Sequence, residues 1–247
     1  MAGRAIVIPF RASGDRRRLL DAVERYLRRH HPDIPVIVAD DDISLPFSLA
    51  ASRNQGVLDA MDSGFTSVAV LDADTIVDPK ALIAAFELVE WEPEIGVVTP
   101  YADYYALDWD ATDVVLEDRW GPLVKPSDLA GHSGATHVGI AISGCYVVDC
   151  DTWCGLGGQD PRFVGWGPED YAFLEQHKAL LGRPFAKLGF GAAAAMRHDR
   201  SEIDRSLSES EQYRRNVDLY GRYINAGLKG YDAMDALVCE HLERKDE

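Results

Sequence analysis

Two aspartates, Asp72 and Asp74, have the types and spacing that point most directly to chemistry in this sequence. They follow the segment 67–71, a short and mostly apolar run that is typical of a strand buried on both faces. Open α/β sheets bind ligands outside the carboxyl ends of their strands, and two carboxylates there suit a divalent cation that prefers oxygen ligands. Such an ion could hold a diphosphate. The alternative is an acidic turn that caps a helix starting near Pro79.

Two more groups of polar residues follow in the first half of the chain. The acids Asp40 to Asp42 come after an apolar run at 36–39, where they could accept hydrogen bonds from a base or a ribose. Arg53 could place a cation near a phosphate or a base. Each feature keeps an ordinary alternative, which is a solvated acidic loop for the aspartates and a surface arginine on a helix for Arg53.

The Gly-rich segment 155–174 gives the strongest signal, because it joins three useful features. It carries Trp166 and runs directly into the acid pair Glu169 and Asp170 at the start of a predicted helix. Glycines let the backbone approach a ligand closely, and an indole offers an apolar face on which a sugar ring could lie. A carboxylate beside that face could take a hydroxyl proton as general base. The alternative is an acid pair that only complements the helix dipole.

His198 is the remaining candidate, because a neutral imidazole is a common metal ligand. A lone histidine is more often structural. The metal interpretation gains weight only where a cation is already assigned to Asp72 and Asp74.

The elements that must position these residues alternate regularly in the first hundred residues. Strands are predicted at 5–9, 36–39, 67–71 and 96–99, and helices at 15–29, 49–62 and 80–89. This alternation predicts an α/β fold with a mostly parallel sheet flanked by helices and joined by right-handed crossovers.

The second half is less regular. Residues 101–137 are expected to be irregular, 140–148 to form a strand, and 168–181 to form a helix with Pro168 at its first position. From residue 206 onward the chain is expected to be helical, with Tyr213, Val217, Tyr220 and Tyr223 on one face, and to pack across both halves.

The bulk composition excludes several classes of partner. The chain has 247 residues, 47% of them hydrophobic, and a net charge of -16, which argues against nucleic acid or an anionic membrane as the main partner. A nucleotide held by a metal ion stays compatible with that charge. The four cysteines are expected to be reduced packing residues. No signal peptide and no apolar run near the roughly 20 residues that span a bilayer are visible, so a cytoplasmic protein is expected.

The ordered set of motifs resembles a known family. The segments 6–10, 51–56 and 71–74, with the acids after the second strand, are similar to GT-A-fold glycosyltransferases of the family 2 type. The segment 157–170 resembles the acceptor block of β-1,4-galactosyltransferases, chondroitin-polymerase-type enzymes and polypeptide N-acetylgalactosaminyltransferases. The resemblance implies one Rossmann-like GT-A domain over residues 1–200, with a nucleotide-sugar-binding half (1–100) and an acceptor half (101–200). Residues 201–247 are then a helical extension.

The resemblance also implies roles for the matching positions. Asp170 would be the catalytic base and Glu169 would orient the acceptor. Mn²⁺ or Mg²⁺ would be held by Asp74, His198 and Asp72. The residues expected to contact the nucleotide sugar are Pro9, Phe10, Arg11, Asp40, Arg53, Asp72, Ala73, Asp74, Trp166 and Gly167.

The sequence departs from the family pattern at two places. Pro168 stands where galactosyltransferases have glycine, which stiffens that turn. Ala195 stands where those enzymes have a metal-binding methionine, and Met196 is one residue away. The expected coordination is therefore specified only for Asp74 and His198.

The predicted function is a metal-dependent, inverting hexosyl- or N-acetylhexosaminyltransferase that uses a nucleotide-diphosphate sugar, with a UDP-sugar favoured. The acceptor hydroxyl could belong to a glycan, a protein or a small molecule. A nucleotidyltransferase acting on sugar phosphates is one alternative, for which Arg11, Gly14 and the arginines 16–18 offer a faint phosphate loop. A non-catalytic carbohydrate-binding protein that uses the Trp166 loop is the other. A dinucleotide oxidoreductase is disfavoured, because no Gly-x-Gly-x-x-Gly follows the first strand.

Overall fold

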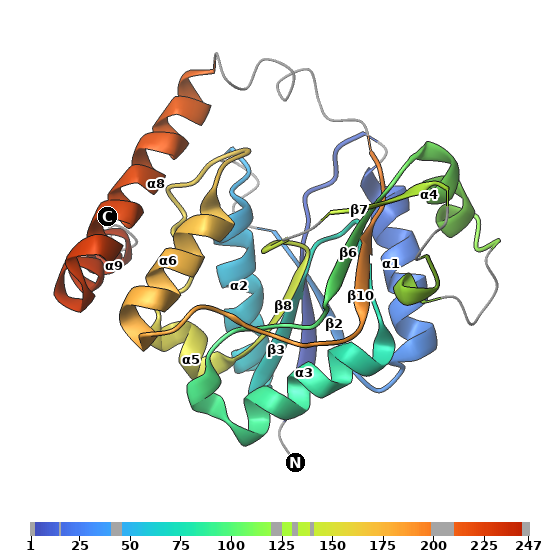
Figure 1. The fold of residues 1–247 in the computed structure, drawn as a ribbon, viewed down its shortest axis with the longest axis horizontal. Coiled ribbons are helices and arrows are strands. Elements are labelled where there is room, and N and C mark those ends of the chain that lie inside the picture. The colour runs from blue at the N-terminus through green and yellow to red at the C-terminus, as the bar shows by residue number, and fades with distance from the viewer. Residues whose placement is uncertain are drawn as a thin grey trace.

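The computed structural model describes residues 3–14, 16–40, 46–119, 125–129, 133–138, 141–198 and 210–243. Figure 1 shows a central sheet with helices on both faces and two C-terminal helices at one side. The first half follows the predicted alternation closely. Its elements are β1 (Arg4–Pro9), α1 (Arg16–His30), β2 (Val36–Ala39), α2 (Leu49–Asp62), β3 (Ser67–Leu71), β4 (Thr75–Val77), α3 (Pro79–Trp91), the 3-10 turn η1 (Pro93–Ile95) and β5 (Val98–Thr99).

The main sheet has the strand order β2-β1-β3-β8-β5-β9 within the described residues, where β8 is Cys145–Asp149 and β9 is Ala186–Lys187. β1 pairs in parallel with β2 and β3, and β5 pairs in parallel with β9. β8 runs antiparallel to both of its neighbours, β3 and β5. The predicted mostly parallel α/β sheet is therefore confirmed, with the correction that it is a mixed sheet with one reversed strand.

The core lies on both faces of this sheet because side chains alternate along each strand. Ile6 and Ile8 of β1 face the cluster that contains α1 and α3, whereas Ala5 and Val7 face the cluster that contains α2, α5 (Cys150–Gly155) and α6 (Glu169–Leu181). Gly56 lets α2 approach the sheet closely, since a Cβ atom there would lie 2.3 Å from the Cγ1 atom of Val7.

A second, smaller sheet has the order β4-β10-β6-β7 in the part of the chain that the structure describes. Its later strands are β6 (Asp103–Leu107), β7 (Ala135–His137) and β10 (Ala192–Ala195). β4 begins directly after Asp74, and β10 ends directly before Met196. The pairing of Thr75 with Ala195 therefore brings the Asp72–Asp74 segment close to the segment that contains His198.

The prediction that residues 101–137 are irregular is wrong. They contain β6, α4 (Trp109–Leu116), the 3-10 turn η2 (Pro126–Leu129) and β7. The signal was weak because β6 is only partly buried and mixes tyrosines with an acid. Asp108 caps α4 by accepting a hydrogen bond from the backbone N–H of Ala111, which is an ordinary helix start hidden among other acids.

Two predicted boundaries in the second half also need correction. The strand predicted at 140–148 begins at Cys145, because residues 141–144 are irregular and bend before it, with a φ of 101° at Gly144. Residue 140 lies outside the described residues. Pro168 is the N-cap of α6 rather than its first residue. A proline is tolerated there because the N–H it lacks has no partner at a helix start.

The chain was predicted to be helical from residue 206 onward. Residues 206–209 lie outside the described residues, and the residues after them form α8 (Glu211–Lys229) and α9 (Tyr231–Glu243), as predicted. Both helices pack against α6 instead of across the two halves of the chain (Figure 1). Of the residues predicted to share one face of α8, Tyr223 is buried, Tyr220 packs partly buried against the same apolar cluster, and Val217 is exposed. The buried positions of α8 are Asn216, Leu219, Tyr223 and Ala226, which follow the helical period.

Two further features bear on the sequence predictions. No helix among the described residues is long and apolar enough to cross a membrane. None of the four cysteines, all of which lie in described segments, forms a disulfide. Cys145 and Cys150 are buried as predicted, but Cys154 and Cys239 are exposed and do not fill the core.

Candidate active site

A pocket of about 100 Å³ lies at the carboxyl ends of β1 and β3. It is lined by six of the residues that the sequence analysis expects around a nucleotide sugar: Pro9, Phe10, Arg11, Asp72, Ala73 and Asp74. Arg16, Leu19, Phe47 and Leu49 complete the wall. Parallel strands end at one edge of a sheet, so residues far apart in sequence meet there. We call this cavity the donor pocket, after the expectation from the sequence that its lining contacts a nucleotide-sugar donor.

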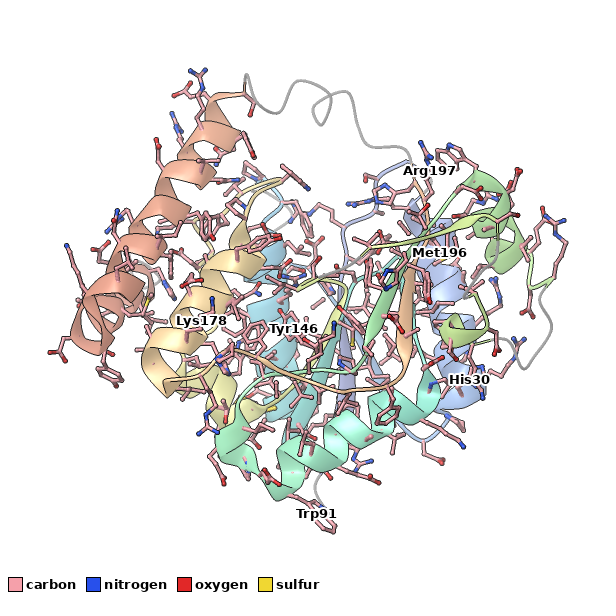
Figure 2. All side chains as sticks on the ribbon, in the orientation of Figure 1. His30, Trp91, Tyr146, Lys178, Met196 and Arg197 are labelled. Atoms are coloured by element: carbon pink, nitrogen blue, oxygen red, sulfur yellow. The ribbon has the colours of Figure 1, made fainter. Side chains whose placement is uncertain are left out.

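Arg53 connects the donor pocket to the Gly-rich acceptor segment. Its side chain is buried on α2, and its Nη2 atom donates to Asp72 Oδ1 at 2.8 Å. Its Nη1 atom donates to Asp170 Oδ1 at 2.6 Å and to Gln159 Oε1 at 3.0 Å. The guanidinium also lies 5.6 Å from the ring centre of Tyr146, which Figure 2 shows near the middle of the molecule. One cation therefore joins two predicted site residues.

A second layer of polar residues holds this arrangement, and the sequence analysis did not identify it. Gln159 exchanges two hydrogen bonds with Asn54: its backbone N–H donates to Asn54 Oδ1, and Asn54 Nδ2 donates to its carbonyl. Gln159 Nε2 donates to the Tyr146 hydroxyl at 2.8 Å. Gly158 permits this approach, because its φ is 67° and a Cβ atom would lie 2.5 Å from Asn54 Oδ1. Asn54 and Gln159 both lie inside the family-like motifs, beside the residues that were identified.

Burial changes the acid–base properties of the network. Burial raises the pKa of Asp72 to about 6, and the nearby Asp170 and Asp74 carboxylates add to the rise while Arg53 opposes it. Burial also raises the pKa of Glu169 to about 8, with Asp170 adding to the effect. Burial opposes the charge on Arg53, but the carboxylates of Asp170 and Asp72 outweigh it and hold its pKa well above the ordinary value.

Glu169 differs from its neighbour Asp170 in its contacts. Its side chain is buried, and its Oε2 atom has no hydrogen-bond partner within the described residues. An unpartnered carboxylate oxygen is unfavourable when ionised and buried, which agrees with the raised pKa. Glu169 is therefore mostly protonated near neutral pH, and could donate a hydrogen bond to an oxygen of a ligand.

Asp74 and His198 form the other predicted site pair that the structure brings together. His198 Nε2 lies 3.3 Å from Asp74 Oδ2, and both side chains are partly exposed. The backbone N–H of Met196 donates to the Asp74 carbonyl at 2.8 Å, which fixes the end of β10 beside Asp74. Two ligand atoms at this separation fit neighbouring positions around one cation with bonds of about 2.1 Å.

Asp72 does not join that pair, since its Oδ1 atom is bound by Arg53. No group of three His, Cys, Asp or Glu side chains in the described segments could hold a metal ion as they stand. Met196 is buried in the apolar core and gives no substitute for the family methionine that position 195 lacks. Of the three predicted ligands, the structure thus brings together Asp74 and His198.

Arg11 and Asp40 form an ion pair beside the donor pocket. The guanidinium of Arg11 lies 2.9 Å from the Asp40 carboxylate and is 5.3 Å from the ring centre of Phe47. Asp40 is therefore engaged by a residue that was also expected to contact the donor. Asp41 and Asp42 lie outside the described residues.

Trp166 and Gly167 lie between α6 and α8. Trp166 is 50% exposed, and its ring stacks on Tyr213 of α8 with a centroid distance of 5.5 Å and an interplanar angle of 25°. A Cβ atom on Gly167 would lie 2.7 Å from Asn216 Nδ2, so this position needs glycine for the close approach of α8. The involvement of α8 was not foreseen, because the family resemblance ends near residue 200.

No protein-family model and no curated protein sequence matches this chain. Among solved structures, it is similar to Drosophila β-1,4-galactosyltransferase 7, in the form of a mutant complexed with manganese, UDP-Gal and xylobiose. That match has 18% sequence identity and a TM-score of 0.51, and it covers 81% of this chain and 72% of the other.

Two further matches are less similar in structure. The catalytic domain of the same Drosophila enzyme in complex with xylobiose has 19% identity and a TM-score of 0.49, with 81% and 72% of the two chains covered. GalNAc-T7 with UDP, GalNAc and Mn²⁺ has 13% identity and a TM-score of 0.49, covering 91% of this chain and 48% of the other. The likeness to the manganese-bound Drosophila mutant shows the fold, which is the GT-A glycosyltransferase fold expected from the sequence.

Proposed function

We propose that this protein is a glycosyltransferase that moves a sugar from a nucleotide-diphosphate sugar to an acceptor hydroxyl. The observation that carries the proposal is the buried Arg53, which binds Asp72 at the donor pocket and Asp170 at the start of α6. A donor-side and an acceptor-side carboxylate thus share one guanidinium. Transfer between two bound substrates requires such a fixed relation, because the reacting groups must be held in a near-attack geometry.

The donor would bind at the pocket lined by Asp72, Ala73 and Asp74. A UDP-sugar is the favoured donor, since the similar Drosophila structure contains UDP-Gal and manganese. Asp74 and His198 would hold Mn²⁺ or Mg²⁺, with the remaining positions left to the diphosphate and solvent. When bound, such an ion supplies positive charge against the departing diphosphate. Arg11 and Asp40 stand beside the pocket, where they would contact the nucleotide.

Asp170 would act as the catalytic base. Arg53 holds its Oδ1 atom, which leaves Oδ2 to accept the proton of the acceptor hydroxyl as the new glycosidic bond forms. Glu169, kept protonated by burial, would donate a hydrogen bond that orients the acceptor. A single displacement that uses one base inverts the anomeric centre, so we propose an inverting reaction.

The proposal is tested by Asp170→Asn in an assay with a panel of UDP- and GDP-sugars and added Mn²⁺. General-base loss is expected to lower the transfer rate by about 10² to 10⁴ while donor binding persists. Glu175→Gln is the matched control, because Glu175 lies on the same helix and forms an ion pair with Lys178 away from Asp170. It should transfer sugar at the wild-type rate.

Wild-type transfer rates in Asp170→Asn would remove Asp170 from the mechanism. Pyrophosphate release from a nucleoside triphosphate and a sugar phosphate would instead identify a nucleotidyltransferase. Sugar binding without any donor turnover would identify a carbohydrate-binding protein. Comparing hexose with N-acetylhexosamine donors in the same panel would define the type of sugar transferred.

A further inference from the structure

The loop that carries Trp166 is held from two sides. On one side, the backbone N–H of Gly165 donates to the Phe47 carbonyl at 3.0 Å, and the hydroxyl of Ser48 donates to the Phe163 carbonyl at 2.7 Å. Phe47 also lines the donor pocket. The loop is thereby fixed directly to the wall of that pocket, so its position is coupled to where a donor would lie.

On the other side, the loop is held by α8 of the C-terminal extension. The buried Asn216 donates from Nδ2 to the carbonyls of Val164 and Trp166, each at 2.9 Å. Its Oδ1 atom accepts from Gln212 Nε2 at 3.1 Å. Beneath it, Leu219 and Tyr223 join the apolar cluster that contains Phe163 and Ala172. The C-terminal extension is therefore held to the loop by both hydrogen bonds and apolar packing.

Tyr213 lies about one helical turn before Asn216. The hydrogen bonds of Asn216 to the loop therefore also place Tyr213 beside Trp166. Residues three apart on a helix share a face, so fixing Asn216 on the loop also aims Tyr213 at it. The two rings stack at 5.5 Å, yet Trp166 stays 50% exposed and Tyr213 is only partly buried. An aromatic pair that only fills the core would be buried, so the exposure of Trp166 and Tyr213 argues against a purely packing role. The two rings overlap face to face, so each covers part of the other and the rest of the stacked pair is open to solvent. Trp166 lies three residues before the first turn of α6, which bears Glu169 and Asp170.

Resting on the proposed function, we propose that Tyr213 determines acceptor specificity. The stacked pair of Trp166 and Tyr213 forms an aromatic platform, in which Tyr213 supports the indole and the exposed part of the stack binds the apolar face of an acceptor saccharide ring. α8 thereby selects the acceptor. The ligand class is an uncharged pyranoside, whose C–H face can lie on the rings while one hydroxyl points toward Asp170. Stacking on such an aromatic surface is expected to raise affinity by roughly 2- to 13-fold, which corresponds to about 0.5–1.5 kcal/mol.

The test uses the full chain and three probes: methyl β-xyloside, methyl β-galactoside and methyl N-acetyl-β-glucosaminide. Their binding is followed by saturation-transfer NMR in the presence of UDP and Mn²⁺. We expect at least one probe to bind the wild type, and Tyr213→Ala to weaken it about five- to tenfold. Tyr213→Phe should keep wild-type affinity, because the ring and not the hydroxyl makes the surface. The UDP dissociation constant of Tyr213→Ala should change less than about twofold.

Val217→Ala is the matched control, since Val217 lies on the next turn of α8 and is exposed. It should bind the probes as the wild type does. Unchanged probe binding by Tyr213→Ala would overturn the platform. So would an equal loss of probe and UDP binding, which would indicate a merely structural role, and so would a wild type that binds none of the three probes.

Hydrolysis of UDP-sugars by the wild type separates this inference from the proposed function. Where the wild type turns over a donor but Tyr213→Ala binds the probes normally, only the platform fails. Where no nucleotide sugar is hydrolysed or transferred, the glycosyltransferase proposal itself fails, whatever the probes do.

Discussion

Asp72 and Asp74 leave the same strand two residues apart, yet they have different partners. Asp72 accepts a hydrogen bond from the buried Arg53, whereas Asp74 faces His198 and the hydroxyl of Thr75. Their side chains are almost equally exposed, at 25% and 24%. Exposure therefore does not distinguish them, and the difference lies in which positive or polar group stands opposite each carboxylate.

Under the proposed function, this contrast assigns a positioning role to Asp72 and a metal-ligand role to Asp74. Asp72 shares its cation with Asp170, so its charge stabilises a buried network that spans the site. Asp74 instead lies against the His198 imidazole and the Thr75 hydroxyl, both of which are groups that a metal ion could replace or join at its oxygens. Removing a shared charge should disturb both substrates' sides of the site, whereas removing a ligand should change only the need for metal.

The largest effect is expected from Arg53→Met. It leaves Asp72 and Asp170 without their common cation, and breaking a buried ion pair typically costs about 3–5 kcal/mol. We expect a loss of about that size in the free energy of unfolding measured with urea, and no detectable transfer. The stability and the transfer activity of Arg53→Lys should lie between those of the wild type and Arg53→Met. An ammonium keeps the charge but cannot donate to both carboxylates in the fork geometry.

Arg17→Met is the control for Arg53→Met. Arg17 also pairs with an aspartate, Asp21, at 2.8 Å, but both side chains are largely exposed. Exposed pairs contribute about 0–1 kcal/mol, so this variant should unfold near the wild-type urea concentration. Equal stability of the Arg53 and Arg17 variants would contradict the assignment of Arg53 as the centre of the network.

The two sides of this network also differ in how far the sequence could predict them. The strand before Asp72 is a local apolar run, so its position and the acid pair behind it could be identified by spacing. The contact between Arg53 and Asp170 could not be identified in this way, since the two residues are 117 positions apart and no local pattern specifies their contact. The strand at β8 was predicted, but its antiparallel direction was not, because strand order and direction depend on pairing between distant segments.

On the acceptor side, even fewer of the supporting contacts could be predicted from the sequence. The Gly-rich loop, Trp166 and the acid pair were recognised from types and order. The residues that hold them, Asn54, Gln159 and Asn216, are ordinary amides whose roles depend on a backbone carbonyl or N–H brought near by the fold. Polar side chains of this kind show no periodic pattern along the sequence, so their roles become visible only in the folded structure.

A smaller effect is expected from removing the ligand pair. Asp74→Asn or His198→Ala should raise the Mn²⁺ concentration for half-maximal activity by roughly ten- to hundredfold, with the fold intact. Asp72→Asn should instead lower turnover with a smaller shift in Mn²⁺ dependence. Mn²⁺ binding measured directly by electron paramagnetic resonance should show the same ranking of the variants, with weaker binding in Asp74→Asn and His198→Ala than in Asp72→Asn. A larger Mn²⁺ shift in Asp72→Asn than in Asp74→Asn would reverse the two roles.

The smallest effect concerns pH and compares Glu169 with its helix neighbour Glu175. Burial raises the pKa of Glu169 to about 8 from an ordinary value near 4.5, so between these pH values the folded protein keeps a proton that the unfolded chain has released. The unfolded state binds fewer protons there, and stability must fall as pH rises through that window. Glu169→Gln, which stays neutral, should remove this part of the decline, making the variant more stable than the wild type by about 1–2 kcal/mol at pH 6.5 relative to pH 5.5. Urea unfolding at a series of pH values measures the difference, and Glu175→Gln should keep the wild-type slope of unfolding free energy against pH.

Identical slopes for Glu169→Gln and the wild type would mean that Glu169 is ionised in the folded protein, and would remove it as the hydrogen-bond donor to the acceptor.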